Sequence, residues 1–263
     1  MKYNHQLILL LTYLLAVSCR ERDTSDYDKG FSVRSNTEEN ASLHSDGFSK
    51  DSLHMATRPG NVMRTLSPAV RLTTIYKVNY DKRDEAYYIG GNHAHYRYDE
   101  EVNTTSNNWN GHLMPGLEAV YGFNMVNVSH YSLSEQRSKN LFEQSVLIGT
   151  VYFPTPEKDT LHGVPVQRDY IMVSAYNEDT NGDGLINPDD LRRMFLFDMQ
   201  GTFKKMLIPE QYAVYKSEYD EANDLMYIFA RFDQDKDGSK GETEPTHIFW
   251  INLKDPTLSG RTY

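Results

Sequence analysis

Cysteine is almost absent from this sequence: Cys19 is the only one among 263 residues. A single cysteine cannot form an intrachain disulfide, so the fold must be stabilised by other means. Clusters of Lys and Arg are also absent, and the formal net charge is −10. Because phosphate binding needs clustered basic side chains, this pattern disfavours nucleic acid as a partner.

The sequence also lacks the short motifs that mark several enzyme classes. It has no G-x-S-x-G nucleophile elbow, no H-E-x-x-H zinc motif, no phosphate-binding loop and no dinucleotide-binding glycines. We therefore predict no enzymatic activity. A glycosidase that uses two carboxylates stays open, because acidic pairs are abundant.

Helical periodicity is weak, whereas aromatic residues are plentiful, with 19 Tyr and 11 Phe. Short β-favouring runs alternate with Gly, Asn, Asp and Pro, which predicts a mainly β fold of antiparallel hairpins or blades, either partly β-propeller-like or a β-sandwich. One short helix over Leu133–Phe142 is an alternative for that segment. The expected strands are Leu72–Tyr80, Ala86–Ile89, Ala94–Tyr98, Ala119–Val128, Ser145–Phe153, Tyr170–Tyr176, Arg193–Asp198, Tyr212–Glu218, Leu225–Phe232 and Thr246–Leu253.

The amino terminus has the pattern of a targeting signal. Lys2 precedes an apolar run from Leu7 to Val17, which is too short to span a bilayer and suits a signal-peptide core. The run ends in L-A-V-S-C, which resembles the bacterial lipobox and implies that residues 1–18 are cleaved and Cys19 is lipidated. A plain secretory signal or a buried amino-terminal helix are the alternatives.

Residues 19–68 are rich in Ser, Asp, Glu, Asn and Gly and have no hydrophobic period. Such a segment cannot bury enough apolar surface to offset the entropy lost on ordering, so we predict a lipid-anchored flexible tether. The β domain is then expected over residues 69–263.

Two segments of that domain repeat each other without a gap. Leu225–Leu253 aligns with Ile171–Met199 at a constant offset of 54 residues. Each copy reads as a strand, an acidic loop and a second strand, so hairpins are predicted at about residues 170–199 and 224–253. A further shift by the same offset reaches Leu117–Ser145, where a strand survives but no acidic loop does.

Both acidic loops have the spacing of a calcium site. Residues 233–244 read DQDKDGSKGETE and fit D-x-[DN]-x-[DN]-G-x₅-E, and residues 179–190 read DTNGDGLINPDD and differ only in the last position. Oxygens at positions 1, 3 and 5 converge as the chain curls, Gly at position 6 permits the turn, and positions 7 and 12 complete the shell. The predicted ligands are Asp179, Asn181, Asp183, Leu185 through its carbonyl, Asn187 and Asp190 in the first loop, and Asp233, Asp235, Asp237, Ser239 through its carbonyl and Glu244 in the second.

These loops resemble those of the EF-hand family, and the first is closer to the dockerin variant. The resemblance covers about a dozen residues twice and implies two Ca²⁺ sites, the second stronger because Asp190 has a shorter arm than Glu244. EF-hand loops lie between helices, whereas strands are expected on both sides here. The alternative is an acidic turn without metal, since Asp, Asn and Gly also build ordinary turns.

A second candidate site is the Tyr- and His-rich segment over residues 87–98. Two histidines on one strand face could begin a transition-metal site, but no further ligands stand at a recognisable spacing. The other interpretations are a glycan- or partner-binding patch and an ordinary half-buried strand. The residues of this candidate ligand patch are Tyr87, Tyr88, His93, His95, Tyr96 and Tyr98.

Together these patterns resemble those of calcium-loop lipoproteins of the Gram-negative envelope. The resemblance implies a protein anchored through Cys19, in the outer rather than the inner membrane, facing the periplasm or the surface. We expect a binding or scaffolding module with envelope protein partners and structural calcium. A glycan-binding or carbohydrate-active lipoprotein that uses residues 87–98 is the alternative.

Overall fold

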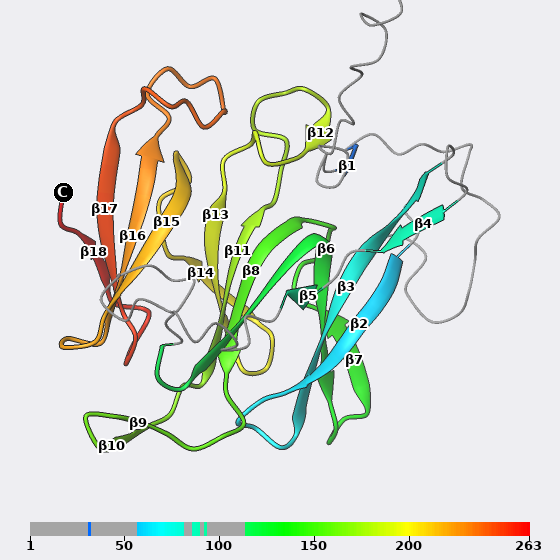
Figure 1. Cartoon of the computed structure of the whole chain (residues 1–263), viewed down its shortest axis with the longest axis vertical. Helices are drawn as coiled ribbons and strands as arrows, with labels where there is room; N and C mark the ends of the chain where they lie inside the picture. Colours follow the sequence, from blue (N-terminus) through cyan, green and yellow to red (C-terminus); the bar gives the residue numbers. More distant parts are fainter. Residues whose placement is uncertain (1–30, 33–56, 82–85, 90–91, 94–113) are drawn as a thin grey trace, which may run out of the picture.

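The computed structural model describes residues 31–32, 57–81, 86–89, 92–93 and 114–263. Within these residues all regular structure is β-strand, every pairing is antiparallel, and there is no helix (Figure 1). The predicted mainly β, antiparallel fold is therefore confirmed. The strands form two main sheets and two short ribbons.

The larger sheet has ten strands, and its main path follows the chain order from one edge to the other. Three short strands pair at its sides, β4 with β3 and β5 and β7 with β6. The path consists of β2 (Thr57–Arg64), β3 (Val70–Asp81), β6 (Leu117–Ser132), β8 (Leu147–Pro154), β11 (Tyr170–Tyr176), β13 (Arg193–Asp198) and β14 (Phe203–Met206). The side strands are β4 (Ala86–Ile89), β5 (Asn92–His93) and β7 (Arg137–Asn140).

The smaller sheet contains the last four strands of the chain, again in sequence order. They are β15 (Tyr212–Asp220), β16 (Leu225–Phe232), β17 (Thr246–Asn252) and β18 (Ser259–Arg261). The two ribbons pair β9 (Asp159–Leu161) with β10 (Val164–Val166) and β1 (Phe31–Ser32) with β12 (Leu185–Ile186). All longer strands thus connect to their neighbours in the chain, as the meander-like spacing of turn residues predicts.

The middle of the larger sheet is buried on both faces. Residues 171, 173 and 175 of β11 belong to one apolar cluster, and Met172 belongs to another on the opposite face. The first cluster extends along the same face to Leu72 of β3, and it also includes Leu141, which follows β7. A register shift in β6 between Tyr121 and Met125 marks a bend, because irregularities of this kind kink a strand.

The smaller sheet packs on the other face of β11 and β13 (Figure 1). Its strand β16 alternates between half-buried and buried positions, and Met226, Ile228 and Ala230 face the larger sheet. Alternation with period two is the pattern of a strand with one covered face, whereas the continuous apolar run of β11 suits a central strand. The fold is therefore layered, with β8, β11 and β13 in the middle.

A buried ion pair joins these layers. The Arg168 guanidinium donates to both carboxylate oxygens of Asp224, at 3.0 and 2.7 Å, and to the carbonyl of Leu253. Both charged side chains are at most 2% exposed. A buried pair of this kind adds little net stability, but loss of one partner leaves an uncompensated charge, so it fixes how the two sheets meet.

The internal repeat holds in the structure with one correction. Phe197 pairs with Ile171 in the first copy, and Ile251 pairs with Met226 in the second. The offset is thus 54 residues in the second strand, as predicted, but 55 in the first strand. The physical reason is that side chains alternate between the two faces of a strand. Ile171 points into the first apolar cluster, and Met226 points into the cluster between the two sheets. Aligning either strand one residue further along would pair side chains that point to opposite faces.

The structure corrects one predicted boundary and excludes one alternative for a segment. The β domain starts at β2 rather than at residue 69, so part of the predicted tether is an edge strand whose Met63 is its one buried side chain. Edge strands bury little, and hydrophobic periodicity therefore does not reveal them. Leu133–Phe142 is not helical either: β6 and β7 form a hairpin, and Gln136 in its turn has a φ of 53°.

Candidate metal centre

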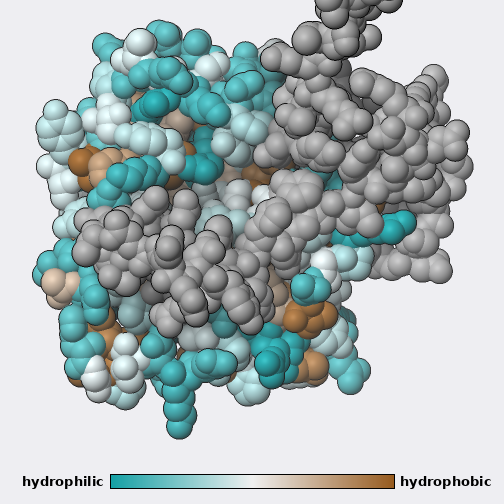
Figure 2. Space-filling view, in the orientation of Figure 1, coloured by the Kyte–Doolittle hydropathy of each residue, from teal (hydrophilic) through white to brown (hydrophobic). Residues whose placement is uncertain are grey.

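Both predicted acidic loops lie at the same end of the molecule (Figure 1). The first, residues 179–190, connects β11 to β13, and the second, residues 233–244, connects β16 to β17. They touch through a β-bridge between Asp190 and Ser239 and through a hydrogen bond from the Thr180 hydroxyl to the Gly238 carbonyl. The surface at this end is largely hydrophilic on the face that Figure 2 shows.

The two loops fold with the same five hydrogen bonds. Position 1 is Asp179 in the first loop and Asp233 in the second. In each loop, the backbone N–H groups at positions 6, 5 and 7 donate to the side chains at positions 1, 3 and 5, respectively. The backbone N–H groups at positions 2 and 9 both donate to the carboxylate at position 12. The first-loop pairs are Gly184 to Asp179, Asp183 to Asn181, Leu185 to Asp183, Thr180 to Asp190 and Asn187 to Asp190. The second-loop pairs are Gly238 to Asp233, Asp237 to Asp235, Ser239 to Asp237, Gln234 to Glu244 and Gly241 to Glu244.

Glycine at position 6 is needed for this curl. Gly184 has a φ of 87° and Gly238 a φ of 74°, both in the left-handed region where a Cβ is strained. Gly238 has a second constraint, because a Cβ there would lie 1.9 Å from the carbonyl oxygen of Thr180. Close packing of the two loops therefore depends on the absence of a side chain at this position.

The second loop gathers three carboxylates. Oxygens of Asp233, Asp235 and Asp237 lie within 4.8 Å of one another, which is close enough to hold a metal ion. Asp233 is only 8% exposed, and its Oδ1 is buried without a hydrogen-bond partner in the described part of the chain. A buried anionic oxygen without a donor is unfavourable unless a cation or water satisfies it.

Glu244 closes the second loop at position 12. Its two carboxylate oxygens accept from the backbone N–H groups of Gln234 and Gly241, at 3.2 and 2.9 Å. Burial raises the pKa of Glu244, and the negative charges of Asp233 and Asp235 raise it further, against the opposing effect of those N–H donors. A divalent cation among these carboxylates would offset the repulsion between them.

The first loop is held more tightly by its own hydrogen bonds. Asp190 is fully buried and accepts from the backbone of residues 180, 181 and 187. Burial raises the pKa of its carboxyl, and these N–H groups partly offset the shift. The Asn187 amide donates to the Asp183 carboxylate at 3.0 Å, while the Asn187 Oδ1 accepts from the backbone N–H of Asp189. The predicted position 9 ligand thus contacts neighbouring loop residues in this arrangement.

Sequence reasoning missed Thr180. Its hydroxyl donates to the Gly238 carbonyl of the other loop, lies 3.2 Å from Asp190 Oδ1, and accepts from the backbone N–H of Leu191. Position 2 is not a ligand position, so the calcium pattern contained no signal for it. Thr180 contacts both predicted sites, and only the packing of the two loops shows this.

The structure describes only some of the other predicted site residues. Cys19, His95, Tyr96 and Tyr98 lie outside the described residues. Tyr87 and Tyr88 belong to β4 and His93 to β5, whose backbones are described but whose side chains are not. The candidate ligand patch over residues 87–98 therefore stays a prediction.

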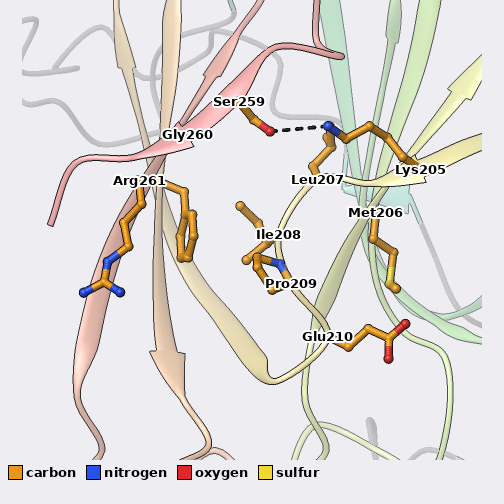
Figure 3. A pocket seen from close by; sticks show the side chains of 10 residues that line it. Lys205, Met206, Leu207, Ile208, Pro209, Glu210, Ser259, Gly260 and Arg261 are labelled. Atoms are coloured by element: carbon orange, nitrogen blue, oxygen red, sulfur yellow. Dashed lines mark hydrogen bonds between the residues drawn. The ribbon is translucent and has the colours of Figure 1, made fainter.

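A separate cleft of about 530 Å³ lies between the edge strands β14 and β18 (Figure 3). Its floor is apolar, with Ile208 and Phe249, and the Lys205 ammonium reaches across to the Ser259 hydroxyl at 3.4 Å. The ends of Glu210 and Arg261 point away from the middle of the cleft (Figure 3). Convergent polar groups, the usual mark of a specific ligand site, are not found here among the described residues.

The chain matches no protein-family model and no curated protein sequence. In the portion that the structure describes, no helix has the length and apolar character needed to cross a bilayer. The geometry of the loops is therefore the basis for the functional argument.

Proposed function

We propose that this protein is a calcium-binding envelope lipoprotein in which Ca²⁺ is structural and the β domain serves as a binding or scaffolding module. The observation that carries the calcium part is the buried Asp233, whose unpartnered Oδ1 belongs to a group of three carboxylates. Hard oxygen ligands at this spacing suit Ca²⁺, which accepts six to eight oxygens in flexible geometry.

Two sites of unequal strength follow from the ligand sets. The second loop offers Asp233, Asp235, Asp237 and Glu244, which are four carboxylates. The first loop replaces one carboxylate by Asn181 and the closing Glu by Asp190, and its ligands already share more hydrogen bonds with the protein. We therefore expect the second site to bind calcium more tightly.

Calcium would then stabilise the end of the fold where the hairpins meet. A chain with one cysteine has no disulfide for this purpose, and extracellular calcium modules typically bind at about 10⁻⁴ to 10⁻³ M. At a calcium concentration 100 times the dissociation constant, one site adds about 2.7 kcal/mol to the free energy of unfolding. This is enough to change the thermal midpoint measurably.

The decisive experiment is thermal unfolding with calcium and with a chelator. Calcium should raise the midpoint of the wild type, and Asp233→Asn should abolish most of this rise because the ligand charge at the buried position is lost. Glu242→Gln is the matched control, since residue 242 is exposed in the same loop and is outside the ligand set. An equal midpoint with calcium and chelator in the wild type would refute structural calcium.

The envelope part of the proposal depends on Cys19 and the lipobox-like sequence before it. Triacylation at this cysteine would anchor the protein almost permanently, because each buried CH₂ contributes about 0.8 kcal/mol. Expression in a Gram-negative host with labelled palmitate should give labelled, membrane-bound wild type and unlabelled Cys19→Ala. A wild type that stays unlabelled would exclude the lipid anchor without affecting the calcium sites. Pull-down from solubilised membranes should then recover envelope partners.

A further inference from the structure

A small pocket adjoins both loops where the two sheets meet. Its volume is about 180 Å³, and its walls come from β11, β15, β16, the residue that precedes β13 and the two loops. Three of its lining side chains are basic, namely Arg192, Arg231 and Lys240. In a protein with a formal net charge of −10, such a concentration of positive charge stands out from its surroundings.

These three cations are not neutralised by ion pairs within the described part of the chain. The ion pairs there use Arg168, Arg193, Lys204 and Lys216 instead. Asp190 is the acidic residue of the pocket lining, but its carboxylate accepts hydrogen bonds from the first loop. The pocket therefore has an excess of positive charge available to a ligand.

The two arginines are held in place by the fold. The Arg192 Nε donates to the carbonyl of Val214 at 2.7 Å, and the Val214 N–H donates back to the carbonyl of Arg192 at 2.8 Å. The Arg231 guanidinium lies over the ring of Tyr215, 5.0 Å from its centroid. Preorganised guanidinium groups bind oxyanions well because little side-chain entropy remains to be lost.

A break in the strand pairing shapes the pocket. The pairing of β15 with β16 changes register between Val214 and Lys216, so Tyr215 is the extra residue of a β-bulge. Bulges often stand beside binding sites, where they redirect a side chain. Here the bulge residue is the aromatic partner of Arg231, and Tyr176 provides a second aromatic ring in the lining.

From these observations we propose that the pocket binds a tetrahedral oxyanion, phosphate or sulfate, either free or as the end group of a larger ligand. The volume is below the roughly 300–1,000 Å³ of pockets for drug-sized molecules, so a small anion or a single anionic group fits it best. Guanidinium groups match oxyanion geometry with paired hydrogen bonds. Since Asp190 and Lys240 belong to the loops, oxyanion binding should need folded loops; this calcium dependence rests on the proposed function.

The test is an NMR titration of the calcium-loaded full chain with inorganic sulfate, with inorganic phosphate and with methyl phosphate. Saturable shifts are expected for residues around Arg192 and Arg231. Arg231→Gln should weaken binding about tenfold or more, since it removes charge-assisted hydrogen bonds. Lys240→Gln, at an exposed position, should weaken it less. Tighter binding of methyl phosphate than of inorganic phosphate would indicate the end group of a larger ligand, and the reverse a free ion.

Arg137→Gln is the matched control, because it removes the same charge from the exposed strand β7. An equal loss of affinity in this variant, or shifts that do not saturate in the wild type, would refute oxyanion binding in the pocket. A chelator should abolish anion binding if the loops need calcium. Anion binding that persists while calcium titration shows no metal site would refute the proposed function and leave the pocket intact.

Discussion

Asp198 and Asn252 occupy equivalent places in the two copies of the repeat. The Asp198 side chain accepts from the backbone N–H of Gln200, at 3.0 Å, and the Asn252 side chain accepts from Lys254, at 2.9 Å. Both therefore cap the turn that follows the second strand of their hairpin. They differ in charge, and only Asp198 has an ammonium partner, Lys204, at 2.6 Å.

This difference predicts a pH-dependent contribution to stability. Burial acts to raise the pKa of Asp198, but Lys204 and the N–H groups of residues 202 and 200 more than offset this, so the pKa is lowered. A lowered pKa means that the contribution is present above the unfolded pKa and is lost as the pH falls through the folded pKa. Asp198→Asn should keep the turn and lower the free energy of unfolding at neutral pH by about 1 kcal/mol or less.

The measurement is urea unfolding of the wild type and Asp198→Asn across the acidic range. The difference between them should shrink as the pH falls below the ordinary range of aspartate. Asn252→Asp serves as the comparison, because a carboxylate there lacks the lysine that Lys204 supplies to Asp198. A constant difference between wild type and Asp198→Asn at every pH would show that charge has no part in it.

At the scale of elements, apolar patterning was sufficient for the central strands. The bounds of β11, β13 and β16 agree with those expected, because each is a continuous or alternating apolar run between turn residues. The strands missed are mostly at edges or in short ribbons, such as β2, β14 and β18. Apart from Met63, their side chains are exposed or half-buried, so hydrophobicity contains little information about them.

The acidic loops show the same limit. Ligand spacing predicted the curl of each loop, because that curl is determined by local hydrogen bonds and by one glycine. The contact between the loops could not be predicted, since Thr180 and Gly238 are 58 positions apart and meet only when both sheets are packed. Oxyanion binding by the pocket was likewise beyond sequence reasoning, because its three basic residues come from different elements.

Gly184 and Gly238 allow the loop contact to be tested, since they are the same loop position with different surroundings. A Cβ at Gly184 meets no atom within 4 Å, whereas one at Gly238 overlaps the backbone of the first loop. Gly184→Ala should cost about 1 kcal/mol from backbone strain alone. Gly238→Ala should cost more and should also weaken calcium binding at the first site, because it pushes against Thr180.

Isothermal titration with calcium and urea unfolding would measure both effects. The contact between the loops couples the two sites if Gly238→Ala weakens calcium binding at both sites while Gly184→Ala weakens it mainly at the first. Equal losses in the two variants would mean that the loops behave independently.

At the scale of the whole molecule, the layers depend on edge strands that look unimportant in sequence. Strand β2 pairs with β3 over Thr57–Arg64, and its Met63 is 8% exposed within the apolar cluster on one face of the larger sheet. Without β2, the long strand β3 would present free backbone groups along this edge. Exposed edges of that length favour association between chains.

Two truncated chains would show where the domain begins. A chain that starts at residue 57 retains β2, and a chain that starts at residue 69 lacks it; both lack the same preceding segment. The shorter chain should unfold at a lower temperature, because burial of a Met side chain alone contributes about 1.5–3 kcal/mol. It should also form larger species in light scattering.

Met63→Ala in the chain from residue 57 separates the two contributions. This variant keeps the edge covered and should lose about 2–5 kcal/mol of unfolding free energy without self-association. If only the chain from residue 69 aggregates, the uncovered edge of β3 is the cause of the aggregation. Equal thermal midpoints for the two truncated chains would place β2 outside the cooperative unit and would restore the boundary at residue 69.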